Sequence, residues 1–266
     1  MQTEKVRLDD HLVSVGLATD IKRAEALLLA GSVLVNDAVQ TKKDYKIKKN
    51  DVVRIRTKIR EFVSRGAEKL QGALERWKDF PIEEVDFWDW GASTGGFSEI
   101  LLLKKAKSVT CVDVGYGQLA SRIANDKRVV VLDRTHFKDF SPKLTKETLK
   151  VGVVMDLSFI SIVQAFERLT EIAQANPEIH LFGLSLLKPQ FEVDPNQLDK
   201  GILRDTSKIG TLLRTIWKRI RKRDPLFHLV GVEESPIRGT LGNREFFLAW
   251  NRFNQSDQFV RRKWLP

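Results

Sequence analysis

From residue 85 onward, short apolar runs alternate with helical patterns, and this alternation constrains the fold more than any other feature of the sequence. Five runs have the length and composition of strands: "VDFWDWG", "SVTCVDVG", "RVVVLDRT", "VGVVMDLS" and "HLFGLSLLKP". Helix-like stretches such as "GFSEILLLKKA" and "SIVQAFERLTEIAQ" lie between them. The alternation is typical of an α/β domain with a mostly parallel sheet covered on both faces. In such sheets, ligands bind at the carboxyl ends of the strands.

Four of the strand-like runs end in an acidic residue, which packing alone does not explain. These residues are Asp89, Asp113, Asp133 and Asp156. Asp113 follows the second strand, where nucleoside-binding folds place the carboxylate that accepts hydrogen bonds from ribose hydroxyls. Asp133 follows the third strand and is placed to accept a hydrogen bond from an adenine amino group. The pattern predicts a nucleoside site at this edge of the sheet.

The turn after the first strand, "DWGASTGGF" at residues 89–97, contains three glycines, which let a ligand approach the backbone. It has neither the G-x-G-x-x-G spacing of a pyrophosphate site nor the lysine of a P-loop. A nucleoside without phosphates therefore fits best, and we predict S-adenosyl-L-methionine. The predicted cofactor residues are Asp89, Gly91, Ala92, Ser93, Gly95, Gly96, Phe97, Asp113 and Asp133.

The first sixty residues have a different pattern, which predicts a small α+β module of two helices followed by an antiparallel sheet. Asp20 is placed to cap the second helix, which stops at Gly31. "SVLVND" and "DVVRIRT" then read as strands. Lys22 and Arg23 fall at the start of the second helix, where backbone N–H groups already attract phosphate.

The charge of the chain favours a polyanionic partner. The sequence contains 45 Lys and Arg against 35 Asp and Glu, a formal net charge of +10. Nucleic acid is the first candidate partner and an anionic membrane the second. The apolar runs are shorter than the roughly 18 residues of a membrane span, and the N-terminus has no signal-peptide core. We therefore expect a cytoplasmic protein without stable membrane insertion.

Two further features limit the kinds of site and surface that are expected. The single cysteine excludes an internal disulfide and argues against a thiolate metal site. The histidines show no metal-ligand spacing either, so no metal site is predicted. The stretch "TLLRTIWKRIRKRDP", residues 211–225, has an apolar stripe and a basic face. It suits either a membrane-surface helix or a helix that packs on the sheet with a basic outer face, and we favour the second.

Motifs along most of the chain resemble a known family. "RLDDHLVSVGLATDIKRAEALLLAGSVLVND" resembles the S-four-type RNA-binding domain, with Asp37 where the family pattern ends in glycine. "DWGASTGGFSEILL", "VDVGYGQLA", "MDLSFIS", "LLKPQFE" and "ESPIRGTLGNREF" together resemble the TlyA (hemolysin A) family. The resemblance covers residues 3–254. It implies an RNA-binding domain followed by an FtsJ-like, Rossmann-like class I methyltransferase domain.

The resemblance also implies boundaries and RNA contacts. We expect the RNA-binding domain at residues 1–59, a linker at 60–66, the methyltransferase domain at 67–254 and a C-terminal tail at 255–266. The RNA contacts carried over from the family are Arg7, Lys22 and Arg23.

FtsJ-like enzymes methylate a ribose 2′-hydroxyl with a Lys-Asp-Lys-Glu tetrad. The resemblance places this tetrad at Lys69, Asp156, Lys188 and Glu245. Lys188 is the candidate base, and general-base help contributes about 10² to 10⁴ in rate. Burial or a nearby Lys69 would favour its neutral form, whereas the two carboxylates oppose it. The alternative is that the tetrad acts chiefly by orienting the reactants.

Together, the residues and the resemblance imply an S-adenosyl-L-methionine-dependent 2′-O-methyltransferase that acts on ribosomal RNA or ribosomal subunits, at a cytidine. Two other functions stay open on the sequence. One is a membrane-active, cell-lysing protein, and the other is a non-catalytic RNA-binding protein that has kept the cofactor pocket.

Overall fold

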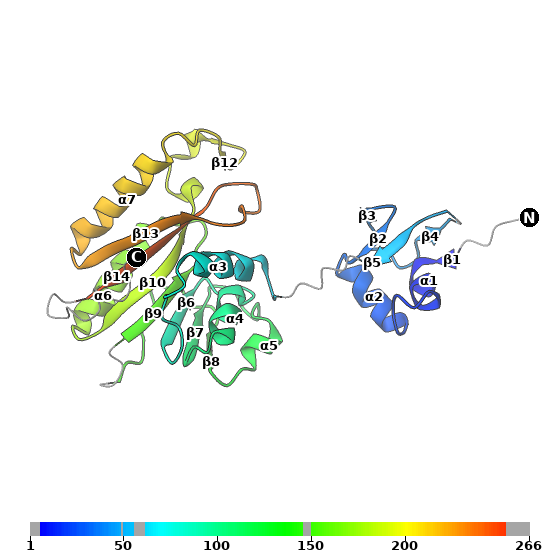
Figure 1. The fold of residues 1–266 in the computed structure, drawn as a ribbon, viewed down its shortest axis with the longest axis horizontal. Helices are drawn as coiled ribbons and strands as arrows, with labels where there is room; N and C mark the ends of the chain where they lie inside the picture. Colours follow the sequence, from blue (N-terminus) through cyan, green and yellow to red (C-terminus); the bar gives the residue numbers. More distant parts are fainter. Residues whose placement is uncertain (1–5, 49, 56–61, 146–149, 254–266) are drawn as a thin grey trace, which may run out of the picture. The chain divides into compact units, whose positions relative to one another are not determined.

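The chain divides into two compact units, Met1–Glu61 and Phe62–Pro266. The computed structural model describes residues 6–48, 50–55, 62–145 and 150–253 (Figure 1). Residues 62–66, expected as linker, belong to the larger unit, because Phe62 and Val63 pack on its core and Arg65 begins a helix. The remaining expected linker residues, 60 and 61, and the expected tail, 255–266, lie outside the described residues.

The smaller unit consists of two helices and short strands around one apolar core. Its helices are α1 (Leu8–Ser14) and α2 (Ile21–Leu29), and Asp20 caps α2 by accepting a hydrogen bond from Arg23 N at 2.8 Å. β3 (Ala38–Val39), β2 (Val33–Val35) and β5 (Val53–Ile55) form an antiparallel sheet, and β1 (Val6–Arg7) pairs with β4 (Lys46–Ile47). Asp37 has a φ of +67°, the turn conformation that glycine would supply. The predicted α+β organisation is confirmed.

The larger unit contains one seven-stranded sheet in the order β13-β14-β10-β9-β6-β7-β8. Its strands are β6 (Asp86–Trp90), β7 (Ser108–Val112), β8 (Val129–Leu132), β9 (Lys150–Met155), β10 (His180–Leu187), β13 (Phe227–Glu234) and β14 (Phe246–Arg252). Five consecutive strands of this sheet are parallel: β10, β9, β6, β7 and β8. β14 runs antiparallel to both of its neighbours, β10 and β13. The predicted mostly parallel sheet is confirmed.

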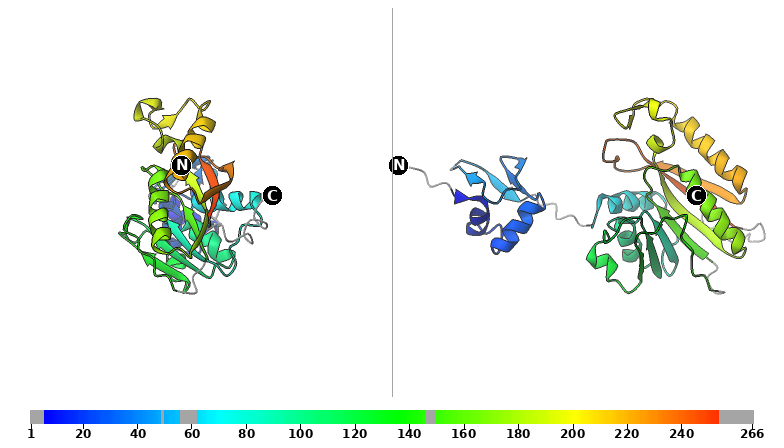
Figure 2. Two further views of the ribbon diagram at one scale, coloured as in Figure 1. Left: turned by 90° about the vertical axis from the view of Figure 1, so that its left-hand side faces the viewer. Right: turned by 180° about the vertical axis from the view of Figure 1, so that it is seen from behind.

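Helices cover both faces of this sheet (Figures 1 and 2). They are α3 (Arg65–Arg76), α4 (Gly96–Leu103), α5 (Ser121–Ala124), α6 (Ile162–Ala175) and α7 (Ile209–Arg223). Two separate apolar cores result, one containing Phe166 of α6 and Ile216 of α7, the other containing Leu70 of α3 and Leu101 of α4. Two 3₁₀ turns and a small hairpin follow β10: η1 (Pro189–Phe191), η2 (Pro195–Gln197), β11 (Leu198–Asp199) and β12 (Ile202–Leu203).

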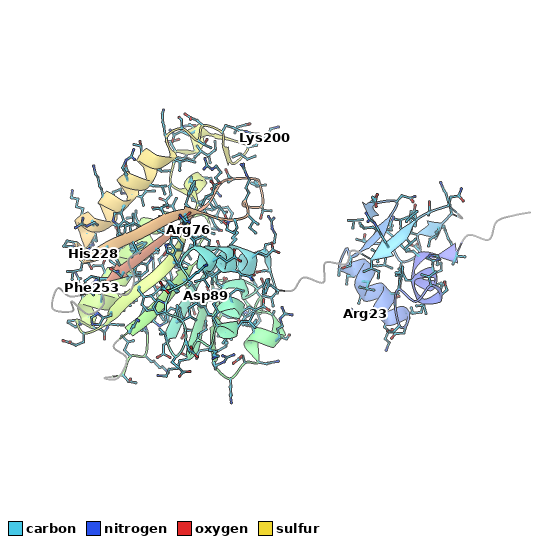
Figure 3. All side chains as sticks on the ribbon, in the orientation of Figure 1. Arg23, Arg76, Asp89, Lys200, His228 and Phe253 are labelled. Carbon is cyan, nitrogen blue, oxygen red and sulfur yellow. The ribbon has the colours of Figure 1, made fainter. Side chains whose placement is uncertain are left out.

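Asp89 lies inside β6 and not at its end, which corrects its expected position. Asp89 is 0% exposed. Figure 3 labels it within the larger unit. Oδ2 accepts hydrogen bonds from Ser98 N at 3.0 Å and from Ser98 Oγ at 2.6 Å, which joins the strand to α4. Oδ1 has no hydrogen-bond partner among the described residues. Burial raises the pKa of Asp89 to about 7, because the ionised carboxylate would lose its hydration.

This raised pKa makes the stability of the larger unit depend on pH. The folded protein binds the proton more tightly than the unfolded chain, so the stability from the neutral carboxyl is complete below about pH 4 and is lost as the pH rises through about 7. In the wild-type protein, the free energy of unfolding should fall by up to about 1.4 kcal/mol for each pH unit across that window. We expect this fall to be absent in Asp89→Asn. Urea denaturation followed by tryptophan fluorescence reports on this unit, because all 6 tryptophans follow residue 76.

Asp86→Asn is the matched control, since Asp86 lies in the same strand, is only partly buried and accepts a hydrogen bond from Ser108 Oγ at 2.6 Å. It should keep the wild-type pH profile. Identical profiles for wild type and Asp89→Asn would contradict the assignment to Asp89.

Candidate active site

The four expected tetrad residues come from four separate segments of the larger unit. Asp156 directly follows β9 and Lys188 directly follows β10, so both lie at the carboxyl edge of the parallel strands. Glu245 directly precedes β14, and the register of this antiparallel strand puts its start beside the end of β10. Lys69 lies just after the first turn of α3.

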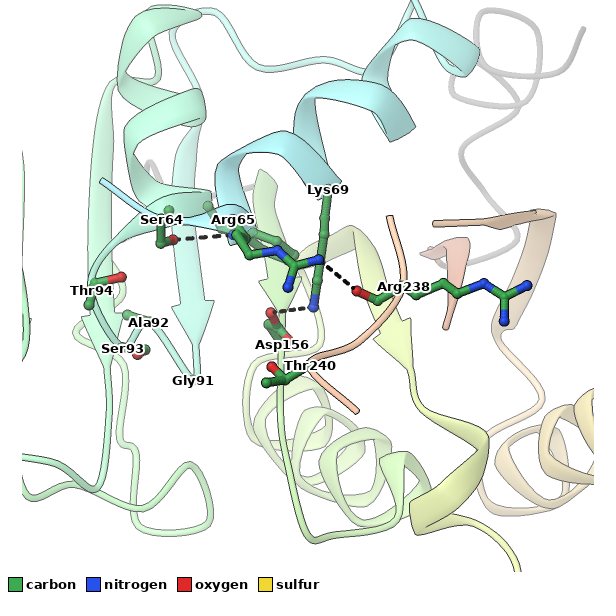
Figure 4. Close-up of a pocket in the computed structure, with 13 residues that line it drawn as sticks. Ser64, Arg65, Lys69, Gly91, Ala92, Ser93, Thr94, Asp156, Arg238 and Thr240 are labelled. Carbon is green, nitrogen blue, oxygen red and sulfur yellow. Dashed lines mark hydrogen bonds and ion pairs between the residues drawn. The ribbon is translucent and has the colours of Figure 1, made fainter. Parts of the chain in front are cut away.

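Two lysines and two carboxylates form a continuous chain of charges at this edge. Lys69 Nζ is 2.7 Å from Glu245 Oε2. It is also 3.5 Å from Asp156 Oδ2, the contact drawn as a dashed line in Figure 4. Lys188 Nζ is 2.6 Å from Asp156 Oδ1 and donates a hydrogen bond to Ser158 Oγ at 2.7 Å. The 2.6 and 2.7 Å carboxylate contacts are ion pairs whose angles fall outside hydrogen-bond geometry. The structure thus brings all four residues together.

The cluster is nearly closed to solvent. Lys69 and Lys188 are each 9% exposed and Glu245 is 3% exposed. A lysine ammonium group is rarely buried to this extent without a carboxylate partner, because an isolated charge loses its hydration. Each lysine therefore needs the carboxylates beside it.

Two glycines allow the segments of the cluster to pack together. A Cβ on Gly72 of α3 would lie 2.6 Å from Pro236 Cγ, so only glycine lets the loop before β14 approach this helix. A Cβ on Gly239 would lie 2.5 Å from Glu245 Oε1. Such distances do not occur for real Cβ atoms, so a side chain at position 72 would push against the ring of Pro236, and one at position 239 would displace the carboxylate of Glu245.

Two cavities meet at this cluster and share Gly91, Ser93 and Asp156 in their walls. The larger has a volume of about 520 Å³ and includes Asp113. The smaller has a volume of about 290 Å³ and includes Lys69 (Figure 4). Asp156 therefore lies between a cavity with a nucleoside-type carboxylate and a cavity with a buried lysine.

The larger cavity has the hydrogen-bond acceptor and the apolar walls that a nucleoside needs. Asp113 Oδ2 accepts a hydrogen bond from Ser93 N at 2.8 Å and Oδ1 accepts one from Gly115 N at 2.7 Å. Each oxygen keeps capacity for a further donor, such as a ribose hydroxyl. Apolar side chains supply surfaces for a base: Val112, Val114, Phe137, Leu157, Phe159 and Ile160. The residues present fit S-adenosyl-L-methionine.

The glycine turn is shaped by contacts within the protein, and two of its glycines, Gly91 and Gly96, also line the cavities. A Cβ would lie 2.9 Å from Asp156 O at Gly91, 2.8 Å from Leu119 Cδ1 at Gly95 and 2.2 Å from Ser64 Oγ at Gly96. Gly91 and Gly95 also have φ values of +80° and +91°. The glycines are required because neighbouring parts of the chain occupy that space.

Of the predicted cofactor residues, six line one or both cavities: Gly91, Ala92, Ser93, Gly96, Phe97 and Asp113. The other three, Asp89, Gly95 and Asp133, line neither of these two cavities. Asp89 is buried against α4, and Asp133 Oδ2 accepts a hydrogen bond from Gly117 N at 2.9 Å. Asp133 therefore orders the loop after β7.

The three expected RNA contacts differ in their availability. Lys22 and Arg23 are exposed at the start of α2, and Arg23 projects from the smaller unit in Figure 3. Arg7 instead forms a two-bond pair with the buried Asp9, with Nη2–Oδ2 at 2.6 Å and Nε–Oδ1 at 3.0 Å. The hydrogen bond from Arg7 lowers the pKa of Asp9. Arg7 is thus engaged within the unit.

Sequence reasoning missed several residues of the site. Ser158 contacts Lys188, and Arg65, Arg238 and Thr240 line the smaller cavity. Ser158 lies in the same "MDLS" run as Asp156, so its proximity to the site could have been expected. His136, which is not among the predicted site residues, lines the larger cavity. Within the described ranges, no group of three or more His, Cys, Asp or Glu side chains is arranged to bind a metal ion.

Comparison with known proteins agrees with both units. Residues 6–53 match the S4 domain and residues 62–252 match the FtsJ-like methyltransferase family. The 16S/23S rRNA (cytidine-2′-O)-methyltransferase TlyA of Mycobacterium tuberculosis is 37% identical over 98% of this chain and 94% of its own length. Hemolysin A of Brachyspira hyodysenteriae is 35% identical over 91% of this chain and 98% of that protein.

A solved structure is similar over most of the chain. The putative hemolysin from Streptococcus thermophilus has a TM-score of 0.65 and 30% identity, covering 94% of this chain and 89% of that one. The predicted combination of an S-four-type domain with an FtsJ-like domain is confirmed by these matches. The chain belongs to the TlyA (hemolysin A) family, in which an S4 domain precedes an FtsJ-like methyltransferase domain.

Proposed function

We propose that this protein is an S-adenosyl-L-methionine-dependent methyltransferase that modifies a ribose 2′-hydroxyl of ribosomal RNA, at a cytidine. The observation that supports this most directly is the position of Asp156, which contacts both lysines where the two cavities meet. The M. tuberculosis relative is named as an rRNA cytidine 2′-O-methyltransferase, and the similarity extends over 98% of this chain. A ribosomal substrate also fits the cytoplasmic location expected from the sequence.

The larger cavity would accept the nucleoside part of the cofactor. Asp113 would accept hydrogen bonds from the ribose hydroxyls, and the turn from Gly91 to Ser93 would lie beside the amino-acid end. S-adenosyl-L-methionine would supply an activated methyl group on a positively charged sulfonium. The protein then has two remaining tasks, which are to align the ribose hydroxyl and to remove its proton.

Lys188 is the proposed base, and its contacts suit that role. A neutral amine has two N–H donors and one lone pair. Ser158 Oγ, at 2.7 Å, would take one donor, and the carboxylate of Asp156, whose Oδ1 lies 2.6 Å from Nζ, would take the other after a small reorientation of the amine. The lone pair would then be left to accept the proton of the ribose hydroxyl, and Lys188 would become an ammonium group stabilised by Asp156.

Lys69, Asp156 and Glu245 are proposed as positioning groups. Lys69 Nζ lies between the two carboxylates, at 2.7 Å from Glu245 and 3.5 Å from Asp156. The positive charge of Lys69 disfavours the protonated form of Lys188, whereas the negative charge of Asp156 favours that form. Because these effects oppose each other, alignment of the hydroxyl by the cluster is expected to contribute at least as much as proton removal.

The two alternative functions receive less support. In the part of the chain that the structure describes, no helix has the length and apolar character needed to cross a membrane. The apolar stripe of α7, which suits either a membrane surface or the favoured packing on the sheet, contributes Ile216 and Ile220 to the core of the larger unit. A non-catalytic RNA-binding protein would have no need of four tetrad side chains joined in one chain of ion pairs.

Mapping of ribose methylation tests the proposal. The protein would be expressed in a bacterium whose own homologue has been deleted, and alkaline-resistant positions in both ribosomal RNAs would be mapped. A new 2′-O-methylated cytidine that depends on this protein is expected. Unchanged methylation in both RNAs, with folded protein present, would refute the proposed activity.

A Lys188→Met variant is expected to lose methyl transfer by a factor of about 10² to 10⁴, because the base is removed while the length of the side chain is kept. Its affinity for S-adenosyl-L-methionine, measured by calorimetry, should stay within about threefold of wild type, since Lys188 lines neither of the two cavities. Lys104→Met, at an exposed position after α4, is the control. Near-normal turnover by Lys188→Met would exclude Lys188 as the base.

Neutralising Lys22 and Arg23 together should weaken RNA binding and reduce its dependence on salt. Two lost phosphate contacts correspond to a decrease of about 1.4 to 1.8 in the slope of log affinity against log salt. Lys42→Gln with Lys48→Gln is the matched control, because both side chains are exposed in the same unit. Equal effects of the two double variants would mean that only the net charge of the unit matters.

A further inference from the structure

Helix α7 concentrates positive charge to a degree that the proposed site does not explain. It contains six basic residues and no acidic residue within Ile209–Arg223. The formal net charge of the entire chain is +10. More than half of this excess therefore lies on one helix, although none of its residues lines either of the two cavities.

The two faces of α7 are chemically separate. Ile209, Ile216 and Ile220 are buried. Ile216 and Ile220 belong to the core of the larger unit, and three further apolar side chains pack against that core: Leu212, Leu213 and Trp217. All six basic side chains are exposed. Arg214, Lys218 and Lys222 recur every four residues, so they form one outward row with about 5–6 Å between successive Cβ atoms.

The basic side chains of α7 are not neutralised by the protein. Across the described residues, no ion pair joins any of the six to a carboxylate, whereas the exposed Arg204 and the partly buried Arg244 each have one. Asp224, which directly follows the helix, is buried and pairs with Arg252 at 2.6 Å. The row therefore presents uncompensated charge to solvent.

Stabilisation of the helix dipole explains only part of this composition. Basic residues in the last turn favour a helix C-terminus, which accounts for Arg221, Lys222 and Arg223. Arg214, Lys218 and Arg219 lie before that turn, where the dipole effect has largely decayed. Another reason is needed for the earlier half of the row.

The basic surface extends toward the segment that follows Lys188. The charge of Arg219 opposes the rise that burial causes in the pKa of Glu192. Glu192 accepts hydrogen bonds from Ser161 Oγ at 2.7 Å and Ile162 N at 2.6 Å, which joins the segment after β10 to the start of α6. A polyanion that leaves the candidate active site in this direction would meet α7.

We propose that the outer face of α7 is a second RNA-binding surface, which binds the phosphate backbone of a duplex segment of the RNA that is methylated. The inference rests on the proposed function, because the ligand is a further part of the same substrate. Contacts of lysine and arginine with phosphate are independent of sequence and fix the register of a nucleic acid on a protein. Anionic lipid is the less favoured ligand, because the apolar side chains that would enter a membrane are already buried.

Salt-dependent binding of the full chain to a short RNA duplex of about 20 base pairs tests the proposal. The variant is Arg214→Gln with Lys218→Gln and Lys222→Gln, which removes the charged row and keeps long polar side chains. Three lost phosphate contacts should lower the slope of log affinity against log salt by about 2 to 3, and weaken binding at low salt by about tenfold or more.

Lys104→Gln with Lys105→Gln and Lys127→Gln is the matched control. These residues are exposed in the turns before β7 and β8, and the substitutions change the net charge equally. The control should keep the wild-type slope. A wild-type slope in the α7 variant, or equal loss of slope in both variants, would overturn the proposal. Loss of binding to phosphatidylglycerol vesicles by the α7 variant, with an unchanged RNA slope, would overturn it in favour of a membrane.

Methylation assays separate this inference from the proposed function. If wild type methylates ribosomal RNA, the α7 variant should have a raised KM and an unchanged kcat, since α7 lines neither cavity. If wild type transfers no methyl group but the α7 variant still loses salt dependence, the RNA surface stands and the proposed activity fails. If wild type methylates and the α7 variant has both a normal KM and a normal slope, the surface proposal fails alone.

Discussion

Two lysine side chains share two carboxylates at the carboxyl edge of the sheet, and the packing of the surrounding segments depends on this arrangement. The ion pairs join the first turns of α3 to the ends of β9 and β10 and to the start of β14. Removing one partner of such a buried pair typically costs about 3–5 kcal/mol, because the other charge is left without compensation. The same contacts that fix the local fold thus fix the groups proposed to act on the substrate.

The sequence predicted the class of fold well, because a buried parallel sheet requires continuous apolar runs with helices between them. The runs ending near Asp113, Asp133 and Asp156 are strands, and each of these aspartates directly follows its strand. The tetrad came from the family motifs alone. Nothing local distinguishes Glu245 from a surface residue before a late strand, and only the antiparallel register of β14 shows why it lies beside Lys188.

Other features could not be predicted, for physical reasons that differ between them. β6 is covered on both faces, so its sequence has no alternation that would separate a carboxylate in the strand from one at its end, and Asp89 was misplaced. Strands of two residues, such as β3 and β4, are too short to produce a pattern. The start of α3 was assigned to a linker although Ser64 caps it, accepting from Gly66 N at 3.2 Å.

The turn between β6 and α4 has a consequence for how tightly a ligand can be bound. Leu119, Ser64 and the carbonyl group of Asp156 occupy the space beside its three glycines. The backbone at Ser93 is fixed in addition by its hydrogen bond to Asp113. The turn is therefore preorganised by the protein's own packing, and an incoming nucleoside does not have to lose affinity to the conformational entropy of ordering it.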